Sequence, residues 1–269
     1  MRTTVFYFSG TGNSLVAARQ LAEKLDSARL IALASLPDDR QFIVDSDIVV
    51  FVFPVYAAGI PVIVKNSLAR LRFTGKPYIC AIATCGGDAG AAIGILATEL
   101  QAKCSMQLAA GWKLLMPGNY TPLYGAFSDK VHETILNAAN ERIELLSGLI
   151  AGRQTCRLET TPAPFSWLVK FIWLGFAGWV GKSDRHFRAL RSCTGCGLCE
   201  KVCLVANIRL NEKGRPVWQQ HCQQCMACLQ YCPVEAIQFC WWTQGRRRYH
   251  HPQVTPSMLA SQKEAISEA

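Results

Sequence analysis

The sequence lacks several patterns that would assign it to a common class of proteins. It begins with Met1 and reaches an apolar run at once, without the basic and then apolar stretch of a secretory signal. It has no helix-turn-helix, no stacking-platform motif and no long basic arm for nucleic acid. The glycine- and hydroxyl-rich stretch at residues 9–14 lacks the Gly-Lys-Ser/Thr that a Walker phosphate loop needs. These absences predict a cytoplasmic protein that does not bind nucleic acid.

Cysteine, by contrast, is abundant, with 13 in 269 residues. Eight of them form two runs of identical C-x2-C-x2-C-x3-C spacing, at residues 193–203 and 222–232. A two-residue spacer lets the backbone curl so that successive thiolates converge, and a cubane iron–sulfur cluster needs four thiolates at the corners of a tetrahedron. The repeated spacing therefore predicts two 4Fe–4S clusters.

The ligand sets follow from the bacterial two-cluster pattern, in which the fourth cysteine of each run binds the cluster of the other run. This crossing predicts Cys193, Cys196, Cys199 and Cys232 for cluster 1, and Cys222, Cys225, Cys228 and Cys203 for cluster 2. One position departs from the pattern. Proline follows the last cysteine of the second run, but Leu204 follows Cys203, which predicts a looser turn there.

Two other interpretations of the cysteines fit less well. A zinc site would be satisfied by two C-x2-C pairs and would leave four of the eight cysteines unexplained. Disulfides are unexpected in a chain without a secretory segment. The five remaining cysteines, including Cys85, are interpreted as small apolar residues in a reducing compartment.

The formal net charge of +9 favours an anionic partner until the cofactors are counted. Each cluster with its four thiolates carries about −2, and a flavin phosphate removes about two further charges. The loaded protein then carries roughly +3, which weakens the argument for nucleic acid. The basic segment 246–252 is typical of a solvated surface; the alternative is that it crosses the domain junction and balances cofactor charge.

The N-terminal region indicates an anion-binding turn. The apolar run at residues 4–8 is followed by Ser9, Gly10, Thr11, Gly12, Asn13 and Ser14, and then by apolar residues at helical spacing. Glycines allow close backbone approach, hydroxyls and the amide donate hydrogen bonds, and the helix N-terminus attracts phosphate. Leu15 replaces the third glycine of G-x-G-x-x-G, so this is not a dinucleotide fingerprint. The alternative interpretation is a polar turn that only caps the helix.

This loop resembles the FMN phosphate loop of flavodoxins. With the cysteine runs that follow, nearly the whole chain resembles flavodoxin–ferredoxin fusion proteins. The resemblance implies two further flavin loops at the carboxyl ends of strands: Pro54, Val55 and Tyr56, and Thr84, Cys85, Gly86 and Gly87. It also implies that Tyr56 stacks on the isoalloxazine ring. Cys85 stands near the place where many flavodoxin-like proteins have an aromatic residue. It is interpreted as a passive pocket wall; the alternative is a redox role, for which no basic partner lies nearby in sequence.

The expected fold is α/β: a flavodoxin-like, doubly wound, five-stranded parallel sheet of order 2-1-3-4-5, with a smaller α+β dicluster ferredoxin unit. The expected domains are an FMN-binding domain at 1–155, an apolar aromatic linker at 156–183, a ferredoxin-type domain at 184–256 and a weakly ordered polar tail at 257–269.

The segment 165–180 is apolar on all sides apart from Lys170. It is too short to span a bilayer, for which about 20 apolar residues are needed. The first interpretation is a helix wedged between the two domains. The alternative is contact with a membrane surface or a larger complex, since tryptophans beside basic residues suit an interface.

The leading functional hypothesis is an electron-transfer protein that passes electrons between two 4Fe–4S clusters and FMN, with no side chain acting as acid or base. Its partner is expected to be a redox protein that donates or accepts electrons. The alternatives are a flavin-dependent reductase of a small acceptor, fed by the ferredoxin domain, and an electron-delivery subunit of a membrane-associated complex.

Overall fold

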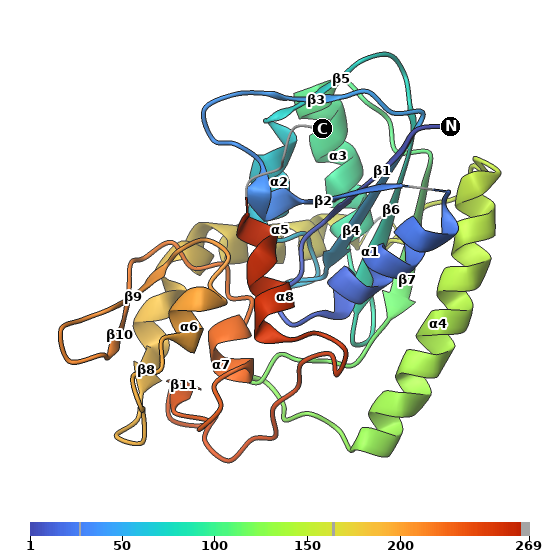
Figure 1. Cartoon of the computed structure of the whole chain (residues 1–269). Coiled ribbons are helices and arrows are strands. Elements are labelled where there is room, and N and C mark those ends of the chain that lie inside the picture. The colour runs from blue at the N-terminus through green and yellow to red at the C-terminus, as the bar shows by residue number, and fades with distance from the viewer. Residues whose placement is uncertain (27, 163–164, 265–269) are drawn as a thin grey trace.

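A parallel sheet flanked by helices makes up the larger part of the molecule, and short elements gather beyond one end of its strands (Figure 1). The computed structural model describes residues 1–26, 28–162 and 165–264. The five strands follow the order β2-β1-β4-β6-β7. They are β1 (Thr3–Tyr7), β2 (Arg29–Ala32), β4 (Ile48–Pro54), β6 (Tyr78–Cys85) and β7 (Ala110–Leu115). Counted along the chain within this sheet, the order is 2-1-3-4-5, so the predicted flavodoxin-like fold class is confirmed.

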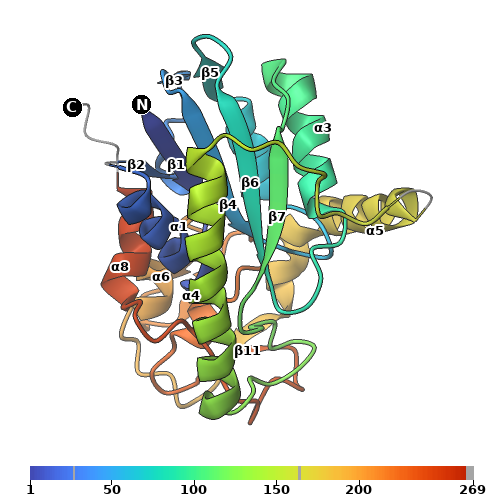
Figure 2. The ribbon, with the colours of Figure 1, turned by 90° about the vertical axis from the view of Figure 1, so that its right-hand side faces the viewer.

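Helices cover both faces of the sheet (Figure 2). The helices α1 (Asn13–Lys24) and α4 (Asp129–Ala151) cover one face, and α2 (Val62–Leu68) and α3 (Ala92–Cys104) cover the other. Strand β4 shows why both faces are apolar: Val50 and Val52 point into one core, while Phe51 and Phe53 point into the other. The continuous apolar run predicted for this strand follows from burial on both sides.

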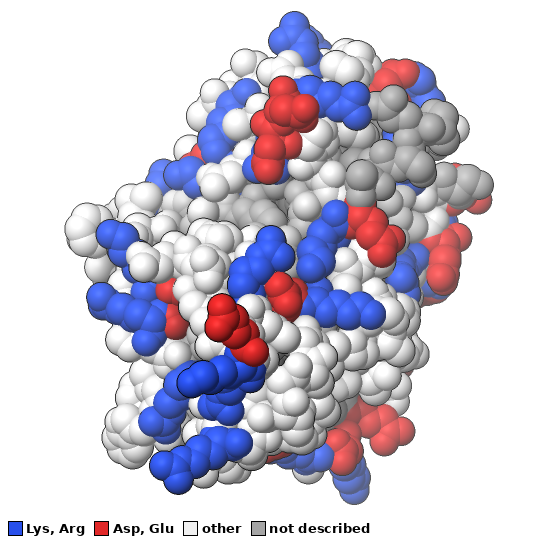
Figure 3. All heavy atoms as spheres, turned by 60° about the vertical axis from the view of Figure 1, so that its left-hand side comes forward, with Lys and Arg blue, Asp and Glu red and all other residues white. Residues whose placement is uncertain are grey.

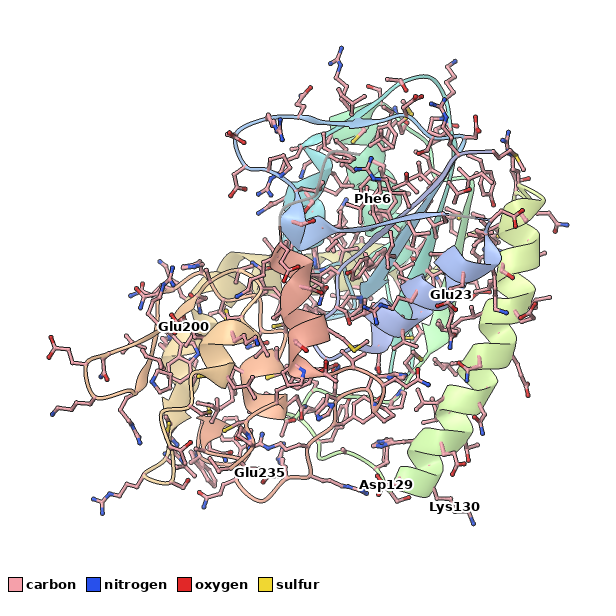
Figure 4. All side chains as sticks on the ribbon, viewed as in Figure 1. Phe6, Glu23, Asp129, Lys130, Glu200 and Glu235 are labelled. Atoms are coloured by element: carbon pink, nitrogen blue, oxygen red, sulfur yellow. The ribbon has the colours of Figure 1, made fainter. Side chains whose placement is uncertain are left out.

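A short parallel pair extends the sheet region and was not predicted from the sequence. It consists of β3 (Phe42–Val44) and β5 (Leu71–Phe73). The turn η1 (Leu33–Ser35) follows β2. Phe42 packs edge-on against Phe6 of β1, with ring centroids 6.1 Å apart, so the pair closes one edge of the aromatic core. Phe6 is labelled at the centre of this core in Figure 4.

The C-terminal part is built from two antiparallel strand pairs and two short helices. Strand β8 (Phe187–Ala189) pairs with β11 (Ile237–Phe239), and β9 (Ile208–Leu210) pairs with β10 (Pro216–Trp218). Helix α6 (Leu198–Lys201) lies in the first cysteine run and α7 (Ala227–Gln230) in the second. Gly214 supplies a left-handed residue (φ 68°) in the β9–β10 turn.

The predicted linker 156–183 divides into two structures. Residues 156–161 lie along the sheet part, because the Cys156 N–H donates to Ala109 O and the Glu159 N–H to Gly111 O. Helix α5 (Ser166–Trp179) and the turn η2 (Val180–His186) follow, and Figure 2 shows α5 projecting from the side of the sheet. Among the described residues, no helix has both the length and the apolar character needed to cross a membrane.

The weakly ordered tail predicted beyond residue 256 is wrong for the part that the structure describes. Helix α8 (Pro256–Ala260) and the turn η3 (Ser261–Lys263) occupy this segment. Thr255 caps α8 by accepting the Met258 N–H, and proline occupies the first turn. Leu259 and Gln262 are fully buried, so packing orders a segment whose composition looks polar. Residues 265–269 lie outside the described residues.

The two parts share their cores. Val202, Ala227 and Tyr231, from the cysteine-run helices and their flanks, join the core beneath α1. Leu204, at the position where proline is usual, is 5% exposed and lies in the opposite core with Phe6 and Phe8. The side chain of Leu204 therefore packs in this core, and a proline ring at the same position would not make the same contacts. This shared burial fixes the cysteine-bearing part on the sheet.

Candidate functional site

A cavity of about 450 Å³ opens at the carboxyl end of the sheet, where doubly wound folds bind their ligands. Loops after β1, β4 and β6 line it together with the second cysteine run. Most predicted flavin residues line this cavity: Ser9, Gly10, Thr11, Asn13, Ser14, Pro54, Val55, Tyr56, Thr84, Cys85 and Gly86. Gly12 and Gly87 do not.

Gly12 is needed for a different reason. It takes a left-handed conformation (φ 104°) at the start of α1, and an added Cβ would lie 2.8 Å from the Cβ of His251. Its missing side chain therefore makes room for the C-terminal segment behind the loop.

Gly10 marks the contact between the loop and the cysteine runs. A Cβ at Gly10 would lie 2.5 Å from the carbonyl oxygen of Cys225 and 3.0 Å from the hydroxyl of Tyr56. Any larger residue would push the second cysteine run away from the sheet. Sequence reasoning assigned Gly10 to close approach of a phosphate, but this close approach is to another part of the same chain.

The hydroxyls of the loop are held by neighbouring groups. Ser9 Oγ accepts the Gly12 N–H at 3.1 Å, and the hydroxyls of Ser14 and Thr84 share a hydrogen bond of 2.8 Å. Thr11 Oγ1 accepts from the amide of Asn119. The first-turn N–H groups of α1 have no partner within the helix and start at this cavity, which is the arrangement that binds anions.

The sequence suggests that Asn13 supplies a free amide to a ligand. In the structure, both polar atoms of this amide are already hydrogen-bonded within the protein. Its Nδ2 donates to Pro117 O at 2.9 Å, and its Oδ1 accepts the Tyr249 hydroxyl at 2.8 Å. The side chain joins three segments that are distant in sequence. Its contribution to the site is to fix the loop.

Two C-terminal residues clasp the loop from behind. The Gln262 amide accepts the Ser9 N–H at 3.0 Å and donates to Ser9 O at 2.9 Å. The His251 N–H donates to Thr11 O at 2.8 Å. His251 is almost fully buried, and desolvation, with a smaller effect from His250, lowers the pKa of its imidazole to about 4. No pattern in the sequence indicated these contacts.

Tyr56 lies between the cavity and the second cysteine run. Its ring packs edge-on against Phe8 at 6.4 Å. Burial raises the pKa of its hydroxyl well above the usual value, and the nearby thiols of Cys225 and Cys222 act in the same direction. The hydroxyl is therefore neutral. Stacking of this ring on a flavin stays a prediction.

Other aromatic side chains also line the cavity, namely Tyr120, Tyr124 and Phe176. The hydroxyl of Tyr124 lies close to glycines of two loops. A Cβ added to Gly118 would lie 2.4 Å from this hydroxyl, and a Cβ added to Gly86 would lie 3.4 Å from it. Cys85 forms part of the wall. Burial raises the pKa of its thiol, so the thiol is uncharged at neutral pH.

The eight cysteines gather in two groups around two separate cavities. Cys193, Cys196, Cys199 and Cys232 line one, and Cys203, Cys222, Cys225 and Cys228 line the other. These are the sets expected from the crossed pattern. Sulfur atoms, yellow in Figure 4, cluster around α6 and α7. Among the described residues, none of the 13 cysteines forms a disulfide.

The thiols of the second group are strongly desolvated. Burial raises the pKa of Cys222 and Cys225 to about 12 in each case, with neighbouring thiols adding to the shift. Iron must therefore displace protons when it binds here. The Gln224 N–H already points to Cys222 Sγ at 3.1 Å, and the Asn207 N–H to Cys203 Sγ at 3.2 Å, which favours the thiolate form. Among the described residues, no three His, Cys, Asp or Glu converge on a single metal ion.

Two buried donors beside the second group have no hydrogen-bond partner in the described part of the chain. The indole Nε1 of Trp218 belongs to a residue lining the second cysteine cavity, and Nε2 of Gln224 to a residue lining the 450 Å³ cavity. Orphaned buried donors are costly, so each position suits an acceptor supplied by a bound group. The residues present therefore fit a sulfide-containing cluster and a ligand with acceptor atoms.

The basic segment 246–252 lies across the junction. Arg246 donates to Thr121 O at 2.7 Å, and Arg247 donates to Phe127 O at 2.8 Å. The partly buried Arg248 donates to Ile237 O and to Gln238 Oε1. Burial lowers its pKa, while the charges of Glu235, Cys232 and Cys228 oppose that shift. Glu235 is labelled at the foot of the C-terminal part in Figure 4.

Comparison with known proteins identifies the C-terminal part. Residues 186–233 match the family model of the 4Fe-4S dicluster domain. No curated protein matches the chain. Solved structures that are similar to the chain include a flavodoxin from the domain Archaea, with 14% identity and a TM-score of 0.36 over 57% of this chain and 98% of that one.

Two further solved structures are similar at comparable levels. Rubredoxin oxygen:oxidoreductase from Desulfovibrio gigas has 16% identity and a TM-score of 0.37, over 56% of this chain and 35% of that one. A flavoprotein in complex with FMN from Lactobacillus acidophilus NCFM has 11% identity and a TM-score of 0.31, over 42% and 92%. These scores are too low to carry an argument, and the fold assignment depends on the strand order. The chain thus combines a sheet of flavodoxin-like strand order with a C-terminal segment that matches the 4Fe-4S dicluster domain.

Proposed function

We propose that this protein passes electrons between two 4Fe–4S clusters and an FMN held within one chain. Cys225 carries the proposal, because it belongs to the second cysteine group and also lines the cavity at the end of the sheet. The close approach of Cys225 to Gly10 means that the two sites share a wall. An electron that leaves the second group toward the cavity crosses this contact and does not need a diffusional encounter.

The cavity suits FMN in size and chemistry. Its volume of about 450 Å³ is within the range of small-molecule sites. The hydroxyls of Ser9, Thr11 and Ser14 and the N-terminus of α1 suit the phosphate. The walls formed by Tyr56, Tyr124 and Phe176 suit a planar aromatic ring. When bound, the flavin supplies one- and two-electron chemistry and the clusters supply single-electron steps.

The chain's own groups position the cofactors and tune them. We infer that the indole N–H of Trp218 donates toward the second cluster and that the amide of Gln224 donates into the shared wall. Neither side chain needs to act as an acid or base. The free thiols need a reducing environment, for which the cytoplasm is the natural candidate, and the external donor or acceptor is inferred to be a redox protein.

A second candidate function is reduction of a small acceptor at the flavin. It is favoured by the cavity mouth, where the lining residues Leu123 and Tyr124 are 71% and 36% exposed. An acceptor entering here would meet an apolar and aromatic surface.

Anaerobic purification followed by iron, sulfide and flavin analysis tests the proposal. We expect about eight iron atoms and one flavin per chain, and reduction of the flavin after single-electron reduction of the clusters. Absence of flavin, or a flavin that stays oxidised while both clusters are reduced, would contradict internal transfer. Sustained turnover of a small acceptor at rates above free flavin would favour the second candidate.

A further inference from the structure

Helix α5 exposes an apolar face to solvent along its whole length. Two stripes of residues face outward. The first consists of Trp167, Phe171 and Leu174, and the second of Leu168, Ile172 and Trp179. Trp167 is 67% exposed, Phe171 72% and Ile172 56%. Isolated exposed apolar residues are ordinary, but a contiguous patch of this kind marks an interaction surface.

The opposite face of α5 is firmly anchored. Trp173 is fully buried, and its indole N–H donates to Ile60 O at 2.7 Å. A Cβ on Gly59 would lie 2.2 Å from Trp173 Cδ1, so this glycine makes room for the ring. The ammonium of Lys65 lies 5.3 Å from the centre of the same ring. The exposed face is therefore presented by a helix that is packed against the loops at the end of the sheet.

The chain segments that flank α5 in sequence are basic, which favours an anionic partner. Residues 153–191 contain seven Lys and Arg and two acidic residues. All seven basic residues are exposed, including Lys170, Lys182 and Arg185. Of the acids, Asp184 is buried and bonded to Asn207, and Glu159 pairs with Arg142. Figure 3, which brings the left-hand side of Figure 1 forward, shows Lys and Arg interspersed with Asp and Glu and with large uncharged areas.

The composition of the exposed face distinguishes a lipid surface from a protein partner. Protein interfaces have a polar rim with frequent hydrogen bonds, whereas Lys170 is the one charged residue of α5. A helix with tryptophan near both ends, an apolar face and basic neighbours is the arrangement that lies in the headgroup region of a bilayer. Anionic lipid attracts exposed Lys and Arg near the surface.

We propose that α5 docks the protein on a lipid bilayer containing anionic headgroups. Trp167, Phe171 and Ile172 insert among the acyl chains near the interface, and Lys170 stays at the level of the phosphates. Phe176, on the inner side of α5, lines the cavity at the end of the sheet. Docking therefore holds that cavity next to the membrane surface. This inference does not depend on which cofactors the cavity holds.

Vesicle flotation with the full, anaerobically purified chain tests the proposal. The vesicles are phosphatidylcholine alone and phosphatidylcholine mixed with phosphatidylglycerol. We expect binding to the anionic vesicles, weakened by salt, and weaker binding to the neutral ones. The double variant Phe171→Ser with Ile172→Ser should bind the anionic vesicles on the order of a hundredfold more weakly, because both side chains lose their apolar burial.

The matched control is Leu145→Ser on α4, which removes an exposed leucine (54% exposed) from another part of the surface and should leave vesicle binding unchanged. Unchanged iron and flavin contents would show that both variants are folded. Failure of the wild-type chain to float with either vesicle overturns the proposal. The proposal is also overturned if the double variant binds the anionic vesicles as tightly as the wild-type chain does. A dimer without lipid that the double variant abolishes would assign the face to a second copy and also overturn it.

Discussion

The two cysteine runs have the same spacing and nearly the same backbone, but they differ at two left-handed positions. The first run has Gly195 (φ 70°) and Gly197 (φ 76°) there, and the second has Gln224 (φ 52°) and Met226 (φ 62°). Glycine adopts this conformation without cost, whereas other residues lose about 1–2 kcal/mol each. The second run therefore tolerates backbone strain that the first avoids.

The side chains at these positions explain the difference. Gln224 and Met226 both line the cavity at the end of the sheet, so they form the wall between that cavity and the second cysteine group. Gly195 and Gly197 lie in the first group's own cavity, and Cys196 beside them is exposed. We infer that the first cluster receives electrons from outside and that the second exchanges them with the flavin. Four experiments test this division of roles, beginning with the largest expected effect.

Loss of a ligand from each group should separate the roles most clearly. Cys225→Ser and Cys196→Ser should each remove one cluster and about half of the iron. In Cys225→Ser, flavin reduction by a single-electron donor should slow by at least about a hundredfold, because the relay beside the cavity is gone. In Cys196→Ser the rate of flavin reduction should fall by a smaller factor than in Cys225→Ser. Anaerobic stopped-flow absorbance measures both rates.

The control for these variants is Cys156→Ser, which alters an exposed cysteine outside both groups and should change neither iron nor rate. An equal slowing in Cys196→Ser and Cys225→Ser would remove the distinction between entry and exit clusters. Full iron content in either variant would refute the ligand sets.

The role of the wall is tested by giving the second cysteine run the two glycines of the first run. The double change Gln224→Gly with Met226→Gly should relieve backbone strain but open the cavity wall. We expect flavin to bind about tenfold more weakly, since apolar contact worth about 1–2 kcal/mol is lost, while iron content stays unchanged. Fluorescence titration of the flavin-free protein with FMN gives the affinity.

The matched change in the first run is Gly195→Ala, which should reduce stability without altering flavin affinity. If both changes weakened flavin binding equally, the side chains at 224 and 226 would have no special place in the wall.

A smaller effect is expected from Trp218→Phe. Phenylalanine keeps the stacking on Phe187, whose ring centroid lies 5.7 Å away, but removes the indole N–H. An N–H donor stabilises the more negative reduced cluster, so its loss should lower the reduction potential of one cluster by tens of millivolts. A redox titration followed by electron paramagnetic resonance resolves the two clusters.

Trp242→Phe provides the comparison, because its indole donates to Pro122 O at 2.9 Å, outside both cysteine groups. Both potentials should stay fixed in that variant. Parallel shifts of both clusters in Trp218→Phe would point to a general structural change.

Acid should affect the flavin site first, and this is the smallest effect. The pKa of His251 is depressed from about 6.5 to about 4 in the folded protein, so the unfolded chain takes up the proton first. The stability that neutral His251 contributes is complete above about pH 6.5 and falls as the pH drops toward 4. We expect flavin to be released over this range before iron is lost.

The release should be followed by flavin fluorescence. His251→Gln removes the titrating group and should flatten the pH dependence between these values. An unaltered pH profile in that variant would show that the release has another cause.

The parts of this architecture that sequence predicts are those set by local spacing. Apolar runs followed by polar loops indicated the strands of the sheet, and a three-residue cysteine period indicated the two cysteine groups. The missed features depend on contacts between distant segments. Leu204 looked like a missing proline until its burial in the sheet core was seen, and Gln224 looked like a spacer between ligands. Polar composition around residue 257 concealed α8, whose Leu259 is buried in the core beneath α1.

The clasp of Gln262 on Ser9 has a consequence for how the protein is made. The two residues are 253 positions apart, yet their hydrogen bonds complete the back of the loop at the cavity. During synthesis the sheet can form early, but this loop stays unfinished until Gln262 has left the ribosome. Cofactor loading at that cavity is thereby deferred until Gln262 has emerged, and a translation product truncated before Gln262 would be left with a defective pocket.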